Sequence, residues 1–324
     1  MTRVGLVLGS GGLAGTAFHA GVITALHEAI GWDARTASVV VGTSAGSTSA
    51  ALLRAGFPPQ DFLPRMTGEP LSRPGEQIMR GMPASSSMGS SRPAQSAGGS
   101  RLRPAAPRML VQAARRPWTV RPGSVASALL PAGRESTGDL RAGFAGLFQQ
   151  WPTDDLWICT VRLSDGRRVV FGRDHVGHRS ATVAEAVGAS CAIPGYYEPV
   201  TIAGERYVDG GMHSLCNADL VADQGLDVVV VSAPMSTSDR LRLSLDQAWR
   251  TAARAQLAVE VRRVARTGTP VLVVHPTPAD RDVMSGAALD ARRRPAIARA
   301  AHASALALLS HTRGPAVEAL AQAA

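Results

Sequence analysis

The stretch VVVGTSAG, residues 39–46, joins a run of valines to a pentapeptide of the form Gly-x-Ser-x-Gly and leads into a helix-like segment, 47–55. An unbroken apolar run is typical of a strand that is covered on both faces. We therefore expect a strand over 38–41 and a tight turn that presents the hydroxyl of Ser44 to the amides of the following helix. A chain this rich in glycine and serine contains such a pentapeptide by chance in roughly a quarter of cases, so the neighbouring sequence has to decide its meaning.

The segments around this turn predict an α/β fold. Before it, residues 4–8 have the composition of a buried strand, and apolar residues recur at helical spacing over 13–30 until a glycine ends the helix. After it, the valine runs 227–231 and 271–274 are strand-sized; a long helix separates them, and an alanine-rich helix follows. Because continuous apolar runs favour parallel strands between helix layers, we predict a three-layer α/β sandwich with a mainly parallel central sheet.

Two hairpins are predicted in the second half of the chain. They cover residues 156–172 and 200–208, each with strand-like segments around a short glycine-containing turn. Between them, Thr182 and Glu185 have the spacing of a capping box, which predicts a helix from Thr182 to about residue 192. The second hairpin ends at Asp209, which two glycines follow.

Composition divides the 324 residues into three parts. The segments 1–67 and 137–324 are expected to build one α/β domain, with 68–136 as an insertion. The insertion holds ten arginines against three glutamates, and so carries most of the formal net charge of +9. Its part over 68–107 is rich in Ser, Pro, Gly and Arg, which predicts disorder or a mobile lid. The stretch 109–121 mixes apolar residues with arginine, which fits either contact with an anionic membrane or a solvated linker.

Several classes of protein are disfavoured. The start of the sequence leaves no room for a signal peptide, and the apolar runs are only strand-sized, so we expect a cytoplasmic protein that meets a membrane at most peripherally. Cys159, Cys191 and Cys216 are too few and too irregularly spaced for a disulfide framework or a C-x-x-C metal site, and we expect no metal and no cofactor. The arginines are dispersed among few aromatic residues, so attraction to anionic lipid headgroups is expected rather than binding of nucleic acid.

Ser44 requires two further groups to act as a nucleophile. A base has to take the proton of its hydroxyl, and the tetrahedral intermediate needs hydrogen-bond donors for its oxyanion. The amides of Gly11 and Gly12, in a glycine-rich loop after the first strand, are the candidate donors. Asp209 is the candidate base; because a pKa of about 3.9 makes a carboxylate a weak base, burial or a matched hydrogen bond has to supply the missing drive. The residues expected to support these turns are Gly42, Gly46, Gly210, Gly211 and Asn217.

These three blocks, in this order, resemble those of the patatin-like phospholipases, a family of lipid acyl hydrolases that use a Ser-Asp dyad. The resemblance covers residues 4–55 and 184–276. It implies a patatin-like fold, a lipid or phospholipid ester as substrate, Ser44 as nucleophile, Asp209 as its base and the loop of Gly11 and Gly12 as oxyanion hole. A water would then attack the acyl-Ser44 ester. Beyond the short motifs, the resembling segments are 189–194, 198–200, 204–211 and Asn217.

Two residues depart from the family pattern. Ala14 stands where the glycine-rich loop of the family commonly carries Arg or Lys, so whatever that cation steadies is missing here. Ala218 follows Asn217 where proline is usual, which is expected to loosen the turn behind Asp209. Neither departure removes a reacting group. The change at Ala14 nevertheless leaves open a protein that keeps the acyl pocket but binds lipid or a partner without turnover.

Two other enzyme classes remain alternatives. The pattern Gly-x-Gly-x-x-Ala over 9–14 fits a dinucleotide fingerprint, but the second strand ends in Gly-Thr-Ser where an NAD-type oxidoreductase needs an acidic residue. Ser44, Asp209 and His275 have the chain order of an α/β-hydrolase triad, but one strand precedes the serine where that fold has several. The side chains that we expect to pack rather than react are His19, His275 and Cys191.

Overall fold

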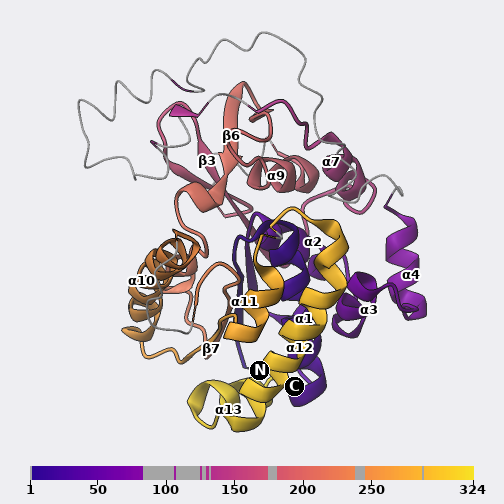
Figure 1. Cartoon of the computed structure of the whole chain (residues 1–324), viewed down its shortest axis with the longest axis vertical. Coiled ribbons are helices and arrows are strands. Elements are labelled where there is room, and N and C mark those ends of the chain that lie inside the picture. Colours follow the sequence, from indigo (N-terminus) through magenta and orange to yellow (C-terminus); the bar gives the residue numbers. More distant parts are fainter. Residues whose placement is uncertain are drawn as a thin grey trace.

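The computed structural model describes residues 2–82, 106, 125, 129–130, 133–173, 181–237, 245–286 and 288–324. Within these ranges, eight strands form one mixed, mostly parallel sheet, and helices cover both of its faces (Figure 1). The chain thus has the three-layer α/β fold that the sequence predicts.

The strands of this sheet come from both sides of the segment 68–136. They are β1 Val4–Leu8, β2 Val39–Thr43, β3 Asp155–Arg162, β4 Arg168–Phe171, β5 Val200–Ile202, β6 Glu205–Asp209, β7 Val228–Ser232 and β8 Val271–Val274. Hydrogen-bonded pairings link them in the order β5-β6-β3-β2-β1-β7-β8, and β4 also pairs with β3. The strands β3, β2, β1, β7 and β8 are parallel to their neighbours in this series. Strands β4 and β6 run antiparallel to β3, and β5 runs antiparallel to β6.

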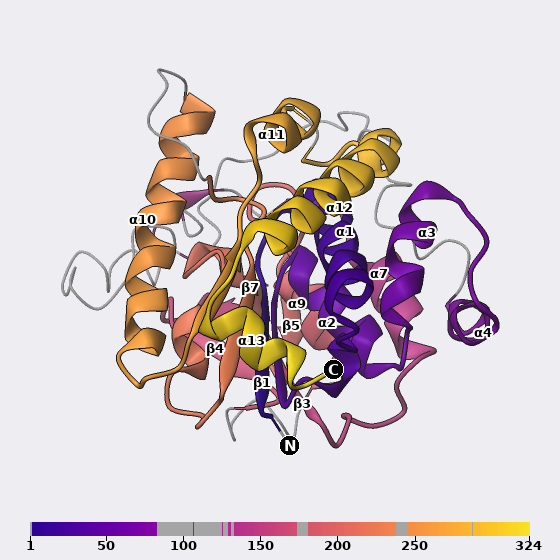
Figure 2. The same ribbon diagram turned by 90° about the horizontal axis from the view of Figure 1, so that it is seen from below.

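Helices pack on the two faces of the sheet. They are α1 Gly12–Ile30, α2 Ala45–Arg54, α3 Phe62–Thr67, α4 Arg73–Arg80, α7 Gly138–Ala145, α9 Val183–Ser190, α10 Leu245–Ala265, α11 Pro278–Met284, α12 Arg294–His311 and α13 Pro315–Ala321. Helix α10 covers one face, while α1, α2 and α12 lie on the other (Figure 2). None of the helices in the described ranges has the length and hydropathy that a transmembrane span requires.

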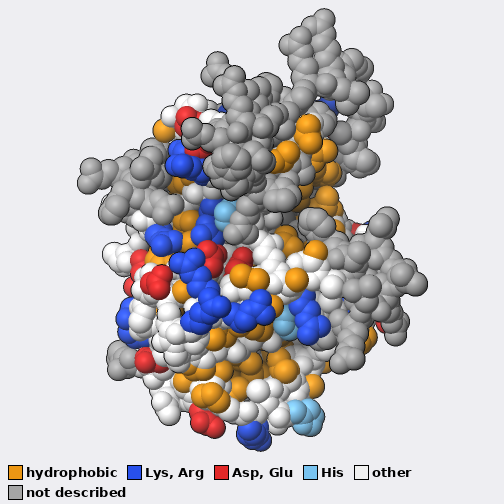
Figure 3. Space-filling model, turned by 90° about the vertical axis from the view of Figure 1, so that its left-hand side faces the viewer, with side chains coloured by type: hydrophobic (Ala, Val, Ile, Leu, Met, Phe, Trp, Pro, Cys, Tyr) orange, Lys and Arg blue, Asp and Glu red, His pale blue; other side chains and the backbone are white. Residues whose placement is uncertain are grey.

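The central strands are buried on both sides, which explains their unbroken apolar sequence. Leu6 and Leu8 of β1 belong to the core beneath α1 and α12, whereas Val7 packs on the opposite face with Leu257 of α10. Figure 3 shows the side of the molecule that is on the left in Figure 1, next to α10, where arginine side chains gather beside apolar ones. Arginines are therefore prominent on the described surface, outside the insertion.

Most predicted elements have their expected positions. The strands over 4–8 and 271–274 are confirmed, as are both hairpins. The capping box of Thr182 and Glu185 is present at the start of α9, and Gly31 ends α1 in a left-handed conformation with φ 80°. Local pattern was thus sufficient wherever strand and helix signals were strong.

Four of the described helices were not predicted, namely α3, α4, α7 and α11. Part of the segment expected to be disordered or a lid forms α4, which begins where the hydroxyl of Ser72 accepts a hydrogen bond from the amide of Gly75 and donates one to Asp61. Helix α11 begins at a capping box of Thr277 and Asp280. Residues 83–105 and 107–124 lie outside the described ranges, so the interpretation of 109–121 stays a prediction.

Candidate active site

Ser44 lies in a tight turn between β2 and α2. Its backbone has φ 53° and ψ −119°, a conformation that costs a residue with a side chain roughly 1–3 kcal/mol. The glycines around it are required by close packing: a Cβ on Gly46 would lie 1.9 Å from the carbonyl oxygen of Leu8, and one on Gly42 would lie 2.5 Å from Cα of Ser47. The elbow can therefore form only with glycine at both ends of the pentapeptide.

Hydrogen bonds from a neighbouring helix hold this elbow in place. The amide of Ser44 donates to Oγ of Ser190, 2.9 Å away, and Ser190 in turn donates to the carbonyl oxygen of Cys159 at 2.7 Å. The hydroxyl of Ser47 donates to the carbonyl oxygen of Ser44 at 2.7 Å. Sequence reasoning gave Ser190 no role of its own, and its place within the segment 189–194 was the only signal for it.

Strand β3 brings Ser44 and Asp209 together. In the register of the sheet, Thr43 at the end of β2 lies opposite Cys159, and Asp209 at the end of β6 lies opposite Thr160. Strand β4 pairs with residues 158–161 of β3, and this range overlaps both the part that pairs with β2 and the part that pairs with β6. Since each edge of β3 holds one partner at a given residue, β2 and β6 both lie on the edge opposite β4, where their last residues meet. The Ser44 hydroxyl is close enough to the Asp209 carboxylate to lower the pKa of that carboxyl.

Burial changes the basicity of Asp209. Its side chain is 4% exposed, and burial raises the pKa of this carboxyl to about 6, although hydrogen bonds from Ser44 and from the amide of Gly211 oppose the shift. The amide of Gly211 lies 2.7 Å from Oδ1 of Asp209. Gly210 is also required here, because a Cβ at this position would lie 2.3 Å from the carbonyl oxygen of Cys159. Burial thus provides the increase in basicity that a carboxylate base was expected to need.

The glycine-rich loop between β1 and α1 lies beside the elbow. Leu8 pairs with Gly42 in the parallel register, and the loop continues from there. Carbonyl oxygens of Ser232, Leu215 and Ala288 accept hydrogen bonds from the amides of three loop residues, Gly9, Ser10 and Leu13. In the described part of the chain, no acceptor faces the amides of Gly11 and Gly12. These two amides, at the positive end of α1, are available for a developing oxyanion.

Ala14 is buried at the position where the family resemblance predicts Arg or Lys. The residue is 3% exposed. The carbonyl oxygen of Ala288 accepts hydrogen bonds from the amides of Leu13, at 2.8 Å, and of Ala14, at 3.4 Å. The first turn of α1 is thus held by a backbone carbonyl from the far end of the chain.

Asn217 connects the turn behind Asp209 to the elbow. Its Nδ2 donates to Oγ1 of Thr43 at 3.1 Å and to the carbonyl oxygen of Ser214 at 2.7 Å, and its Oδ1 accepts from Arg168 at 3.0 Å. Thr43 directly precedes Ser44, so the side-chain amide of Asn217 helps to fix the position of Ser44.

The turn at Ala218 has a hydrogen-bonded contact that the sequence did not predict. The amide of Ala218 donates to Oε2 of Glu260 at 2.9 Å, and the hydroxyl of Ser214 donates to Oε1 at 2.5 Å. A proline at position 218 has no N–H to donate. Glu260 comes from α10 and is 5% exposed; burial raises its pKa, and the bonds from Ser214 and Ala218 partly offset this. Sequence reasoning missed Glu260, since no local pattern signals that one carboxylate of α10 is buried.

Both histidines singled out in the sequence have structural partners. Nε2 of His19 donates to the carbonyl oxygen of Gly9 at 2.7 Å, and Nδ1 accepts from the hydroxyl of Ser232 at 2.8 Å; burial lowers the His19 pKa to about 4, so the ring is neutral. His275 follows β8, three strands from β2, which is roughly 14 Å away. It bonds with Ser236, so it is not a partner of Ser44.

The cysteines do not add a reactive thiol. Cys159, Cys191 and Cys216 are all buried, and burial raises the pKa of each thiol above its usual value. Among the described residues, no group of three or more His, Cys, Asp or Glu side chains is placed to hold a metal ion.

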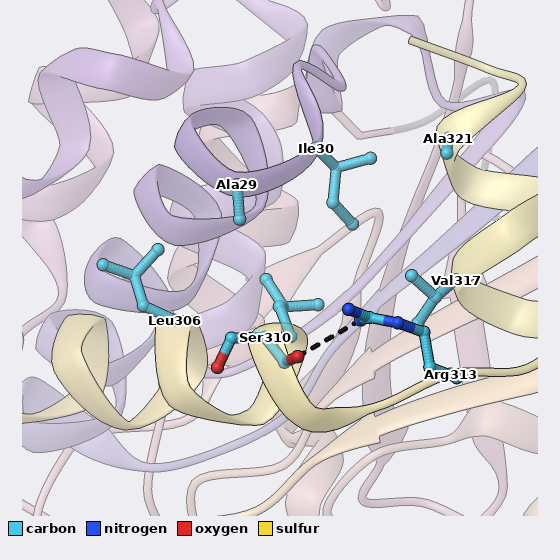
Figure 4. A pocket seen from close by; sticks show the side chains of 8 residues that line it. Ala29, Ile30, Leu306, Ser310, Arg313, Val317 and Ala321 are labelled. Atoms are coloured by element: carbon cyan, nitrogen blue, oxygen red, sulfur yellow. Dashed lines mark hydrogen bonds between the residues drawn. The ribbon is translucent and has the colours of Figure 1, made fainter.

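A groove of about 530 Å³ lies elsewhere on the molecule, between α1, α12 and α13 (Figure 4). Ile30 and Leu306 contribute to its apolar lining, and Arg313 donates to the carbonyl oxygen of Ser310 at its side. Ile30 is the last residue of α1, whereas the glycine-rich loop precedes the first, so roughly 27 Å of helix separates them. The groove is not part of the site around Ser44.

Comparison with known proteins assigns the chain to a family. One solved structure that is similar, VipD from Legionella pneumophila, shares 14% sequence identity and a TM-score of 0.40; the match covers 95% of this chain and 66% of that one. The sequence profile described as patatin-like phospholipase matches residues 6–222, from β1 through the turn that contains Asn217. With most of its length matched, including the elbow and the Asp-Gly-Gly turn, the chain belongs to the patatin-like phospholipase family.

Proposed function

We propose that the protein is a lipid acyl hydrolase that cleaves carboxylic esters through a dyad of Ser44 and Asp209. Members of its family are typically serine lipid acyl hydrolases, which gives lipid esters as the substrate class. The observation that carries the proposal is that Ser44 and Asp209 meet at the ends of β2 and β6, where burial raises the pKa of the Asp209 carboxyl to about 6 and the Ser44 hydroxyl acts to lower it. Because its pKa is higher, this carboxylate in its ionised form accepts a proton more readily than an exposed carboxylate does.

Acylation follows from this arrangement. Asp209 accepts the proton of the Ser44 hydroxyl as Oγ attacks the ester carbonyl carbon. The amides of Gly11 and Gly12 stabilise the resulting oxyanion. Asp209 then transfers the proton to the departing alcohol, and the C–O bond to that alcohol breaks, which leaves the acyl group on Ser44. Attack of a water on this ester releases the fatty acid and restores the hydroxyl.

Labelling and turnover test the proposal together. A fluorophosphonate probe is expected to label the wild type but not Ser44→Ala. Esters of p-nitrophenol and phospholipids with a series of acyl chain lengths are expected to be hydrolysed by the wild type and by neither Ser44→Ala nor Asp209→Asn. If the wild type hydrolyses none of these substrates, or if Ser44→Ala keeps full activity, the proposed function is wrong.

A second candidate function is binding of lipid without turnover. The enclosed alanine at position 14, in place of a cation, favours it. This function predicts that the protein binds fatty-acid or phospholipid probes while the fluorophosphonate leaves Ser44 unlabelled. The labelling experiment therefore separates the two candidates directly.

A further inference from the structure

A largely enclosed arginine contacts the side-chain amide behind the elbow. Arg168, the first residue of β4, donates through Nη1 to Oδ1 of Asn217 at 3.0 Å and to Oδ1 of Asp219 at 2.7 Å. Its Nη2 donates to Oδ2 of Asp219 at 2.8 Å, and the side chains of this ion pair are 18% and 16% exposed. The guanidinium thus bonds to a neutral amide in addition to its carboxylate partner.

This contact helps to determine which way the Asn217 amide points. The oxygen of an asparagine amide can only accept a hydrogen bond, and its nitrogen can only donate. Because a guanidinium only donates and the carbonyl oxygen of Ser214 only accepts, Oδ1 faces Arg168 and Nδ2 faces Ser214. The second proton of Nδ2 is then directed to Oγ1 of Thr43. Without Arg168, Oδ1 of this fully buried side chain would have no donor among the described residues, which favours a turned amide.

Thr43 connects the amide to the proposed nucleophile. Its side chain is fully buried, it is the last residue of β2, and Ser44 follows it. The backbone of Ser44 has a conformation that residues with a side chain adopt only where the surroundings hold them in it. Ser190 holds the elbow from α9, and Asn217 holds the residue before it. A residue of β4 is thus linked to Thr43 of β2, although β3 lies between these two strands.

Assuming that the proposed dyad operates, we propose that Arg168 is a positioning residue for Ser44. It fixes the amide of Asn217, this amide fixes Thr43, and Thr43 keeps Oγ of Ser44 in place beside Asp209. Arg168 gives and takes no proton in the reaction. A shift of roughly 1 Å in a reacting group can lower a rate about 100-fold, so the loss of such a support is measurable.

A different role for Arg168 would be to neutralise Asp219 and nothing more. An ion pair with that role contributes to the stability of the fold but does not change how fast Ser44 reacts in a folded molecule. The rate constant of Ser44 labelling by a fluorophosphonate is a property of folded molecules, because a misfolded fraction lowers only the extent of labelling. This rate constant therefore separates the two roles.

Labelling rates of Arg168→Leu, Asn217→Ala and the double variant test the proposal. Each single variant is expected to react at least about tenfold more slowly than the wild type. The double variant is expected to react no more slowly than Asn217→Ala, because both changes break the same series of contacts. With a p-nitrophenyl ester, Arg168→Leu is expected to lower kcat at an unchanged KM, since the proposal gives Arg168 no contact with the ester.

Arg162→Leu provides the matched control. Arg162 of β3 belongs to the same hairpin and pairs with Asp165 through side chains that are 24% and 21% exposed. This variant loses an ion pair of similar exposure and is expected to label at the wild-type rate. If Arg168→Leu does not fold, Arg168→Leu combined with Asp219→Asn leaves no unpaired carboxylate and is expected to show the same slow labelling.

Each contrary outcome has one meaning. Labelling of either single variant at the wild-type rate would overturn the proposal, as would equal slowing in Arg162→Leu. Effects that multiply in the double variant would show that Arg168 acts without Asn217, which also overturns it. A wild type that fluorophosphonate does not label would instead contradict the dyad itself.

Discussion

At the scale of single residues, Asp209 combines a contact with a perturbed basicity. Its carboxylate is buried and lies beside Ser44, whose hydroxyl acts to lower its pKa. Because burial favours the neutral acid, the pKa is nevertheless raised to about 6, and the ionised form that is needed to accept a proton predominates only above that pH.

The pH dependence of activity follows from this pKa. For an uncharged p-nitrophenyl ester, kcat/KM is expected to rise as pH increases through about 6 and then to level off, because the rate follows the ionised fraction of Asp209 in the free enzyme. Rates measured from pH 4.5 to 8 check this, with Asp209→Asn as the inactive control. A rise centred near pH 4 would show that burial does not perturb the carboxyl.

Asp209 also lowers stability at neutral pH. Its folded pKa, about 6, exceeds the unfolded value, so between the two the folded state binds more protons and the free energy of unfolding falls as pH rises. Asp209→Asn is expected to be more stable than the wild type at pH 7.5, by up to about 3 kcal/mol, and nearly equal to it at pH 4. Urea denaturation at both pH values measures the difference. A variant less stable than the wild type at pH 7.5 would contradict this.

At the scale of secondary-structure elements, α10 supports the turn behind the site from the opposite face of the sheet. Glu260 reaches from this helix to the hydroxyl of Ser214 and the amide of Ala218. Asn217, between these two residues, bonds to Thr43, which directly precedes Ser44. Glu260 of α10 thus accepts a hydrogen bond from the amide that alanine provides at position 218.

Ala218→Pro tests this contact. The substitution removes the N–H that bonds to Oε2 of Glu260 and is expected to cost about 1–3 kcal/mol of unfolding free energy, since a buried acceptor loses its donor. Position 218 is the first residue of a 3₁₀ helix, where proline suits the backbone, but Asn217 before it has φ 57° and ψ 33°, which proline restricts; the difference between two backgrounds therefore reports the contact with Glu260. Urea denaturation in the wild-type and Glu260→Gln backgrounds measures it. An equal loss in both would show that the charge of Glu260 is irrelevant.

The elements differ in how far sequence could predict them. The valine runs and the Thr182 capping box were sufficient because their signals are local. Helix α4 was missed because the Ser and Pro that start it were taken as signs of disorder. In the site, the glycines could be named from sequence, whereas the roles of Ser190 and Glu260 depend on which distant segments pack together. The meeting of Ser44 with Asp209 came from the family resemblance, and its physical cause, the shared edge of β3, needed the register.

At the scale of the whole molecule, the formal net charge of +9 favours binding to an anionic surface. The insertion carries ten of the arginines, and further arginines lie on the described surface near α10 (Figure 3). Peripheral binding of the protein to an anionic membrane through residues 68–121 remains our prediction from sequence.

Vesicle sedimentation tests this binding. Replacing the arginines between residues 92 and 121 by serine is expected to weaken binding to phosphatidylserine vesicles at least tenfold, since each basic residue near such a surface contributes about 1 kcal/mol. Hydrolysis of a water-soluble p-nitrophenyl ester is expected to stay unchanged, and vesicles of phosphatidylcholine alone serve as control. Unchanged binding to the anionic vesicles would remove the insertion from this role.

The contact between Ala288 and the first turn of α1 has a consequence for biosynthesis. On the ribosome, β1, the glycine-rich loop and the elbow are translated first, yet the amides of Leu13 and Ala14 acquire their acceptor only when the segment after α11 has emerged. A nascent chain therefore holds Ser44 long before the loop beside it is fixed. Under the proposed function, lipid hydrolysis is expected to begin only once Ala288 has emerged from the ribosome.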